Sequence, residues 1–275
     1  LIYTATVRLA RELHAWLGEH EIAAGIYHGK LPDAEREEAQ RRFMDDEFRV
    51  MVATNAFGLG IDKPNIRFIV HYHFPDSLET YYQEAGRAGR DGKTARVSLL
   101  YRLEDKRVQS YFLGGKYPKR DDTIRLLDVL RQLAGSQAAV SWAKLAEVAA
   151  ISERRCKVIS AQLEAIGLVE RKRGRVRLRQ TVDGAQPLET VLDTYEARRA
   201  HDRERLDTMM HYAQTGKCRS RVLHEYFDEP IDEDCGHCDN CEAHAQGLPA
   251  AGLEHTHTAA GARAHPAPLP PRRSE

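Results

Sequence analysis

Short apolar runs alternate with amphipathic stretches along the first 118 residues of the chain. Five of the apolar runs predict strands, at 1–4, 25–28, 49–54, 66–72 and 96–101. Apolar positions recur at helical spacing over 7–20 and 33–44, and a further helix is predicted to start at Asp76, with Asp76 as N-cap and Glu79 completing a capping box. This alternation predicts an α/β domain over 1–118, built on a parallel sheet with helices on both faces.

The rhythm of the sequence changes after residue 120. Three helices are predicted, at 123–134, 142–149 and 153–166. Ser152 is placed to cap the third of them. Residues 168–179 then turn near Gly174, and apolar and basic side chains alternate on the return strand, which predicts a β-hairpin. The three helices and the basic hairpin together predict a winged-helix-like domain over 121–182.

A long charged helix is predicted over 188–215, and it leads into a cluster of cysteines. We expect residues 186–246 to form a helical hairpin with a small metal-binding module. The last residues, 247–275, are rich in Ala, His, Pro and Gly and cannot bury enough apolar surface to fold. They predict a disordered tail.

The composition is that of an ordinary globular protein. Hydrophobic residues make up 42% of the chain and charged residues 30%, and the mean hydropathy is −0.56. The 41 Lys and Arg residues balance 41 Asp and Glu residues. Any affinity for nucleic acid must therefore come from local clusters of charge rather than from the net charge.

The sequence contains no run of 18 or more apolar residues and no signal-peptide pattern. It therefore favours a cytoplasmic protein without a membrane partner. The chain opens on Leu1-Ile2-Tyr3-Thr4, a strand already under way, rather than on Met. We expect it to be a fragment whose N-terminal part is missing.

The most informative stretch is Gln-Glu-Ala-Gly-Arg-Ala-Gly-Arg-Asp-Gly at 83–92. On a helix, Gln83, Arg87 and Arg90 would fall at i, i+4 and i+7 and share one face. Two planar guanidinium groups aimed one way suit the charge that develops on a transferring phosphoryl group. The alternative is a solvated basic face whose arginines pair with neighbouring carboxylates.

A second candidate site lies where the strand predicted over 49–54 ends in a polar, glycine-rich turn. Parallel sheets bind their ligands at this edge. Gly58 and Gly60 permit another group to approach the backbone closely, and Thr54 and Asn55 carry side chains that can bond to phosphates or sugars.

Taken together, these stretches resemble the second motor domain of superfamily 2 helicases, and specifically that of the RecQ family of DNA helicases. Residues 53–65 are similar to the fifth helicase motif and 81–92 to the sixth, and both motifs are long and specific. Residues 27–29 (Tyr-His-Gly) with Arg36 are similar to the conserved region that precedes them, and the strand end at Thr4 is loosely similar to the fourth motif.

The resemblance implies a RecA-like fold that uses ATP and Mg²⁺ together with a first motor domain. It implies that Arg87 and Arg90, with Gln83, act at the ATP phosphates across the cleft between the two motor domains. Arg90 is favoured as the arginine finger. Gly60 and Asp62 would line the same cleft.

By the same resemblance, Thr54, Asn55 and His28 lie near the bound DNA strand. The chain has no G-x-x-x-x-G-K-[ST] phosphate loop and no acidic motif to hold Mg²⁺. This stretch of sequence alone is therefore predicted not to hydrolyse ATP.

Four of the five cysteines are clustered, and they are Cys218, Cys235, Cys238 and Cys241. Thiolates at the C-x-x-C-x-x-C spacing can close a tetrahedron around Zn²⁺, and such a four-ligand site is structural. Independent core cysteines are the alternative. The spacing also resembles the zinc module of RecQ helicases. Cys156, His71 and His73 are interpreted as core or strand-edge residues, and His237 as a neighbour of the zinc site rather than a ligand.

The predicted hairpin is strongly basic. Its basic residues face a single acid, Glu170, and are Arg171, Lys172, Arg173, Arg175, Arg177 and Arg179. They suffice for several phosphate contacts and a salt-dependent grip on DNA. A solvated basic hairpin is the alternative. In the usual RecQ plan the zinc module follows the motor directly and the winged helix comes last, so the order of modules here departs from the family's plan.

These features predict the C-terminal part of a RecQ-like, ATP-dependent DNA helicase that unwinds duplex DNA in repair or recombination, with 3′ to 5′ polarity by resemblance. Its partners would be ATP and DNA, both single-stranded and at duplex junctions, in the nucleoid. One alternative is a non-catalytic DNA-binding regulator that uses the winged helix and the zinc module. The other is an RNA-remodelling helicase, against which the four cysteines argue.

Overall fold

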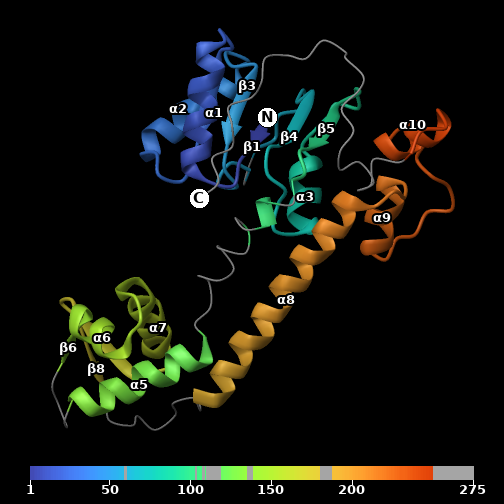
Figure 1. Cartoon of the computed structure of the whole chain (residues 1–275). Helices are drawn as coiled ribbons and strands as arrows, with labels where there is room; N and C mark the ends of the chain where they lie inside the picture. Colours follow the sequence, from blue (N-terminus) through green and yellow to red (C-terminus); the bar gives the residue numbers. More distant parts are fainter. Residues whose placement is uncertain are drawn as a thin grey trace. The chain divides into compact units, whose positions relative to one another are not determined.

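The computed structural model describes residues 1–58, 61–102, 104–106, 109, 119–134, 139–179 and 188–249. The chain divides into two compact units (Figure 1). The first consists of Leu1–Gln109 and Arg205–Glu275, and the second is the segment that separates these two ranges in the sequence, Ser110–Glu204. The boundary falls inside one long helix, α8 (Leu188–Gln214). This division differs from the predicted one, because the cysteine-bearing segment groups with the first sheet.

A five-stranded parallel sheet forms the centre of the first unit. Its strands are β1 (Ile2–Tyr3), β2 (Ala24–Tyr27), β3 (Val50–Ala53), β4 (Phe68–His71) and β5 (Arg96–Leu99). They lie in the order β2-β3-β1-β4-β5, and every neighbouring pair is parallel. The predicted parallel sheet is confirmed. At its carboxyl edge, Tyr3 of β1 pairs with Ala53 of β3 and His71 of β4.

Helices α1 (Val7–Glu19) and α2 (Asp33–Met44) form where the helical spacing predicts them. Thr6 caps α1 by accepting a hydrogen bond from the amide of Leu9 at 3.2 Å. Successive residues of β3 point to opposite faces of the sheet. Val52 packs in a cluster with residues of α1, whereas Met51 belongs to a second cluster that contains Phe43 of α2.

Helix α3 (Leu78–Ala85) corrects two predictions. Its N-cap is Ser77, whose hydroxyl accepts from the amide of Thr80 at 3.2 Å, and Asp76 instead accepts from the Thr80 hydroxyl at 3.0 Å. The capping box at Asp76 and Glu79 is therefore wrong, since serine one residue later reaches the free amide. The helix also ends at Ala85, with Gly86 as its C-cap, so it stops before Arg87.

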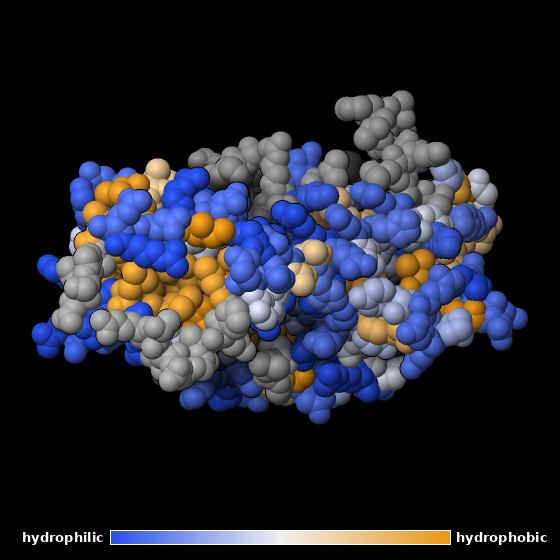
Figure 2. Space-filling view, turned by 90° about the horizontal axis from the view of Figure 1, so that it is seen from below, coloured by the Kyte–Doolittle hydropathy of each residue, from blue (hydrophilic) through white to orange (hydrophobic). Residues whose placement is uncertain are grey.

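The second unit has the element order of a winged helix. Its elements are α5 (Arg120–Ala134), β6 (Val140–Ser141), α6 (Trp142–Ala149), α7 (Glu153–Ala165), β7 (Val169–Lys172) and β8 (Arg175–Leu178). The strands form an antiparallel sheet in the order β6-β8-β7. Strand β6 was not predicted, because two residues give no alternation to detect. Figure 2 shows hydrophobic side chains at the surface of this unit, at the left of the view.

Two local predictions in the second unit are confirmed. Ser152 caps α7 by accepting from the amide of Arg155 at 3.4 Å. The β7–β8 hairpin turns at Arg173 and Gly174, which both have positive φ, +47° and +77°. Positive φ at both central residues is the signature of a type I′ turn, whose twist matches that of the flanking strands.

The first unit is completed by the end of α8, by α9 (Arg219–Tyr226) and by α10 (Asp239–Ala245). Among the described residues, no helix combines the length and the hydrophobicity needed to cross a membrane. Of the predicted disordered tail, 247–275, all but the first three residues lie outside the described part of the chain.

Candidate functional site

Arg87 and Arg90 converge on the turn that follows β3. Each donates a hydrogen bond from Nη1 to the carbonyl oxygen of Ile61, at 3.3 Å and 3.4 Å. The same nitrogen of Arg90 donates to Oδ1 of Asp62 at 2.7 Å. The two sequence motifs therefore meet in space, and the site gathers two guanidinium groups at the carboxyl edge of the sheet.

This convergence has a different cause from the predicted one. Arg87 and Arg90 follow the end of α3, so the helical face shared with Gln83 is wrong, and Gln83 is an exposed residue on the helix itself. The turn is possible because Gly89 has a φ of +64°, where an added Cβ would lie 2.8 Å from the carbonyl oxygen of Lys93. Glycine is required at that position.

Gly58 allows Arg87 to lie against the backbone. A Cβ added at Gly58 would come within 2.9 Å of Nη2 of Arg87. The prediction that this glycine permits close approach is thus met by a side chain of the same chain. Gly60, the other predicted glycine, lies outside the described residues.

The turn after β3 is held at its far end by a buried lysine. The side chain of Lys63 is 6% exposed and donates to Asp46 at 2.7 Å and to the carbonyl of Met44 at 3.1 Å. Asn65 donates to the same carboxylate at 3.1 Å. These bonds fix the stretch that follows Ile61 and Asp62 to the end of α2.

The residues predicted to face DNA differ in exposure. Asn55 is exposed and Thr54 is buried, with its amide bonded to the carbonyl of Tyr27 at 3.2 Å. His28 is fully buried, and Nε of the exposed Arg11 donates to its Nε2 at 3.2 Å. Burial lowers the pKa of His28, so its ring is held neutral as an acceptor for Arg11.

Helix α3 is joined to the cysteine-bearing segment through Glu79. Tyr226 of α9 donates to Oε1 of Glu79 at 2.8 Å, and Arg205 of α8 donates to Oε2 at 3.2 Å and to the hydroxyl of Ser77 at 3.0 Å. Two ring pairs flank these bonds. Tyr81 lies 5.2 Å from Tyr212, and Tyr82 lies 4.9 Å from Phe227, between ring centroids.

Sequence reasoning missed this contact. Residues more than 120 positions apart form it, and a single sequence holds no signal for such pairing. The sole hint is compositional, since aromatic residues occur at 81–82 and again at 226–227.

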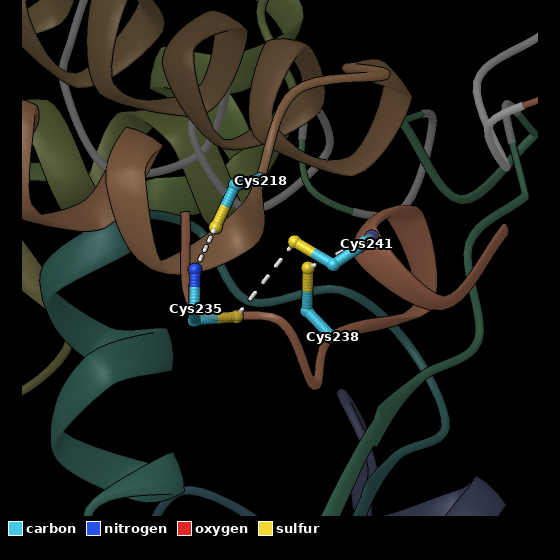
Figure 3. A group of neighbouring side chains, drawn as sticks. All are labelled: Cys218, Cys235, Cys238 and Cys241. Carbon is cyan, nitrogen blue, oxygen red and sulfur yellow. Dashed lines mark hydrogen bonds between the residues drawn. The ribbon is translucent and has the colours of Figure 1, made fainter. Parts of the chain in front are cut away.

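The four clustered cysteines come together as predicted. Their sulfur atoms all lie within 4.8 Å of one another, and Sγ of Cys235 lies 4.0 Å from Sγ of Cys241 (Figure 3). A tetrahedron of Zn–S bonds of about 2.3 Å requires sulfurs about 3.8 Å apart, so the donor set fits Zn²⁺ with small adjustments. The cluster is a structural zinc site, held by Cys218, Cys235, Cys238 and Cys241.

Backbone amides donate hydrogen bonds to two of the four sulfur atoms. Sγ of Cys218 accepts from the amide of Cys235 at 3.3 Å, and Sγ of Cys238 accepts from the amides of Arg219 and Cys241 at 3.4 Å and 3.5 Å. Burial raises the pKa of the Cys241 thiol to about 12. Zinc must therefore displace a proton there, and its charge supplies the driving force.

Buried polar contacts hold the zinc ligands in place. Asn240 is fully buried and donates to the carbonyls of Thr215 and Lys217, at 2.9 Å and 2.6 Å, just before Cys218. Arg219 binds both carboxylate oxygens of Asp239, at 3.0 Å and 3.1 Å. These contacts tie the start of α9 to the start of α10, so the first ligand is fixed relative to the last two.

The predictions for His237 and for the fifth cysteine, Cys156, agree with the structure. His237 is exposed and its Nδ1 bonds to the carbonyl of Cys235 at 2.7 Å, outside the group of four sulfurs. Gly236, the residue before it, has a φ of +73°, which lets the loop between two ligands turn tightly. Cys156 is fully buried in the core of the second unit.

The basic side chains of the hairpin in the second unit fall into two groups, paired and unpaired. Arg171 and Arg177 are paired, with Glu164 at 2.6 Å and Glu170 at 2.5 Å. The remaining basic side chains are exposed and form no ion pair with an acid among the described residues. They are Lys172, Arg173, Arg175 and Arg179. Three of these four residues, Lys172, Arg173 and Arg175, lie at the turn or directly beside it, and Arg179 follows the end of β8.

Two family models match the chain. One, described as the helicase conserved C-terminal domain, matches residues 1–92, which hold strands β1 to β4 of the sheet and both arginines. The other, described as RecQ zinc-binding, matches residues 173–242, which include all four zinc ligands. Two separate segments of the same chain therefore match the two family models.

Several similar curated proteins are named as DNA helicases. The "ATP-dependent DNA helicase RecQ" of Bacillus subtilis is 50% identical over 113 residues, 41% of this chain and 19% of that protein. RecQ of Pasteurella multocida is 50% identical over 84 residues, which are 30% of this chain and 13% of that protein. The "Probable ATP-dependent DNA helicase RecS" of B. subtilis is 28% identical over 245 residues, covering 86% and 46%.

The chain thus spans less than half the length of each of these relatives. Within that span, the convergent arginines, the parallel sheet and the four-cysteine zinc site agree with both matching models. The chain therefore carries a helicase conserved C-terminal domain and a RecQ zinc-binding module, and it is similar to RecQ-family helicases.

Proposed function

We propose that the complete gene product is an ATP-dependent DNA helicase, and that this chain supplies its second motor domain. The observation that carries the proposal is the meeting of Arg87 and Arg90 at Ile61. Guanidinium groups gathered at the carboxyl edge of a RecA-like sheet are placed to stabilise charge on phosphates bound by another domain. The names of the RecQ relatives support the same activity.

The two arginines would divide the work. Arg87 is half-buried against Gly58, so its direction is fixed by packing. Arg90 is exposed and paired with the exposed Asp62, a bond that it can exchange for a phosphate. Arg90 is the better finger, because it can reach outward. Gly60 and Asp62 would line the nucleotide cleft, and Gln83, exposed on α3, would contact the nucleotide from the helix.

DNA would be held at two places. Asn55 would contact the tracked strand at the carboxyl end of β3, next to the buried Thr54, and the buried His28 would act by holding Arg11. The basic residues of the β7–β8 hairpin would grip duplex phosphates, chiefly through Lys172, Arg173 and Arg175, and less strongly through Arg171 and Arg177, which are paired with glutamates. Cycles of ATP binding and hydrolysis would then move the strand, 3′ to 5′, with ATP and Mg²⁺ bound mainly by the first motor domain.

The zinc site would hold the accessory segment rigid while the motor moves. We further propose that the protein acts in the cytoplasm, on the nucleoid, at duplex junctions formed in repair or recombination. The competing function is a DNA-binding regulator in which the motor-like domain is inert. The convergence of both arginines favours the motor, since an inert scaffold has no need of it.

The test is ATP hydrolysis by the complete gene product, with and without single-stranded DNA, beside Arg90→Ala. We expect DNA-stimulated turnover that falls about a thousandfold or more in the variant. No turnover by a folded, zinc-loaded wild-type protein would favour the regulator. Competition between single-stranded DNA and RNA of the same sequence separates a DNA helicase from an RNA-remodelling one.

A further inference from the structure

A buried pair of polar side chains lies behind the arginines. His71, the last residue of β4, is fully buried, and Glu84, in the last turn of α3, is 9% exposed. Nε2 of His71 lies 2.9 Å from Oε2 of Glu84. The pair joins the carboxyl end of a central strand to the carboxyl end of the helix that leads to Arg87.

The surroundings of His71 fix its proton. Its ring is stacked with that of Tyr3, at 5.6 Å and 18°, and lies 4.9 Å from that of Tyr81. Its Nδ1 is buried and has no hydrogen-bond partner. A proton on Nδ1 would be a buried, unbonded donor, which costs more than an unbonded lone pair. The ring therefore carries its proton on Nε2 and donates it to Glu84.

The pair is connected to Arg87 by two short paths. The amide of Arg87 donates to the carbonyl of Glu84 at 3.3 Å, so the turn begins at this residue. The other path runs through Tyr3, whose hydroxyl donates to the carbonyl of Phe57 at 3.1 Å. Burial raises the pKa of Tyr3, the Glu84 carboxylate raises it further, and the charge and a hydrogen bond of Arg87 lower it. Tyr3 thus links the His71 ring, on which it stacks, to Phe57, the residue before Gly58.

A contribution to stability alone does not explain this arrangement. Replacing both partners of a buried hydrogen bond by apolar side chains of the same shape is often nearly neutral. The position of Glu84, three residues before Arg87, points instead to a geometric role.

We infer that His71 and Glu84 are positioning residues, which lock the end of α3 to the end of β4 and thereby hold Arg87 against Gly58 and Ile61. This inference rests on the proposed function, since it supposes that Arg87 acts at the ATP phosphates. Neither residue touches the nucleotide. A displacement of Arg87 by about 1 Å can lower the catalytic rate about a hundredfold.

The experiment uses three variants of the complete gene product. Glu84→Ala removes the acceptor, His71→Phe removes the donor but keeps a ring between Tyr3 and Tyr81, and Glu84→Gln keeps an oxygen that accepts from His71. We expect kcat for DNA-stimulated ATP hydrolysis to fall about tenfold to a hundredfold in the first two, with KM for ATP within about twofold of wild type. Glu84→Gln should recover most of kcat.

Controls separate this inference from its alternatives. Glu37→Ala removes an exposed glutamate of α2 and should leave kcat unchanged. Arg87→Ala tests the proposed function: if it keeps full activity, the proposed function fails on its own account. If Arg87→Ala is inactive while folded Glu84→Ala and His71→Phe keep kcat, the inference is overturned. If Glu84→Ala does not fold, the kcat of His71→Phe decides. If Glu84→Gln loses as much kcat as His71→Phe does, the inference is also overturned.

Discussion

Arg90 donates from Nη1 to the carboxylate of Asp62 at 2.7 Å, which joins the sixth helicase motif to the fifth. The side chain of Asp62 is 84% exposed and that of Arg90 is 39% exposed. An ion pair in this setting contributes about 0–1 kcal/mol, because water screens it. A phosphate group can therefore replace Asp62 as the partner of Arg90 at little cost.

The first prediction concerns the shape of the Arg90 side chain. Arg90→Lys keeps the charge but loses the planar fork that bonds two phosphate oxygens at once. We expect kcat of the complete gene product to fall at least about tenfold, with ATP affinity within about twofold. Arg96→Lys, at an exposed residue of β5, is the matched control and should not change turnover. Full activity of Arg90→Lys would show that charge alone suffices.

The second prediction concerns the space that Gly58 leaves for Arg87. A Cβ in Gly58→Ala would lie 2.9 Å from Nη2 of Arg87, at the far end of a flexible side chain. The protein can relieve this clash by moving Arg87, so we expect an almost unchanged melting temperature and a kcat lowered about tenfold or more. Gly18→Ala, where no atom lies within 4 Å of the added Cβ, is the control. Equal kinetics in the two variants would contradict the assignment of Arg87.

Local patterns explain which parts of this fold were predictable. Alternation of apolar runs and helical spacing gives the five strands of the sheet and α1 and α2, because each element buries one face against its neighbours. The Ser152 cap and the turn at Gly174 follow from chemistry within four residues. The cysteine spacing gives the zinc site for the same reason, since its ligands lie close in sequence.

Contacts distant in sequence could not be predicted in this way. The convergence of Arg87 and Arg90 was expected for a wrong reason, because Gly86 and Gly89 end the helix and form a turn that periodicity does not reveal. The bond of Glu79 to Tyr226 and the pair of His71 and Glu84 depend on tertiary packing. A single sequence marks them as a capping residue and a strand-edge histidine.

The third prediction concerns the support of the zinc ligands. Asn240→Ala removes the donor from the carbonyl of the buried Thr215 and from that of Lys217, which costs about 1–3 kcal/mol. We expect zinc affinity to fall about tenfold, measured by competition with a chromophoric chelator, although all four cysteines remain. Cys238→Ser should lose zinc more completely. The control is Asp232→Ala, at an exposed loop residue. If Asn240→Ala and Asp232→Ala bind zinc equally tightly, the side-chain amide of Asn240 does not support the zinc ligands.

The fourth prediction concerns pH and Glu79. Partial burial opposes ionisation of this carboxyl, but hydrogen bonds from the backbone, Tyr226, Ser77 and Arg205 hold its pKa at about 2, below the ordinary 4.5. A pKa lowered by folding stabilises the protein above about pH 4.5, and the stabilisation is lost as the pH falls toward 2. Because the side chain is 34% exposed, we expect only ~1 kcal/mol.

The measurement compares urea unfolding of wild type and Glu79→Gln across that range. Their difference in unfolding free energy should be constant from neutral pH down to about 5 and should shrink below about 4.5. Both proteins lose zinc alike in acid, so the difference isolates this carboxyl group. A difference that grows as the pH falls would mean that Glu79 is protonated in the folded state.

The fifth prediction concerns the basic hairpin, in which only part of the charge is free. Lys172, Arg173 and Arg175 have no acidic partner among the described residues, whereas Arg171 and Arg177 are paired with glutamates. Each basic side chain that neutralises a duplex phosphate adds roughly 0.9 to the steepness of log Kobs against log salt. Replacing the three free residues by Ala should thus make that slope shallower by about 2 to 3, measured by fluorescence anisotropy with this chain and a duplex junction.

The matched control replaces the two paired residues, Arg171 and Arg177, by Ala. Their guanidinium groups are already neutralised by Glu164 and Glu170, so binding to phosphate would require breaking those pairs. We expect the slope to become shallower by less than about one in this double variant. If the slope changes equally per substituted residue in the two variants, all basic side chains of the hairpin contribute alike. The ion pairs with Glu164 and Glu170 would then not determine which side chains bind the DNA.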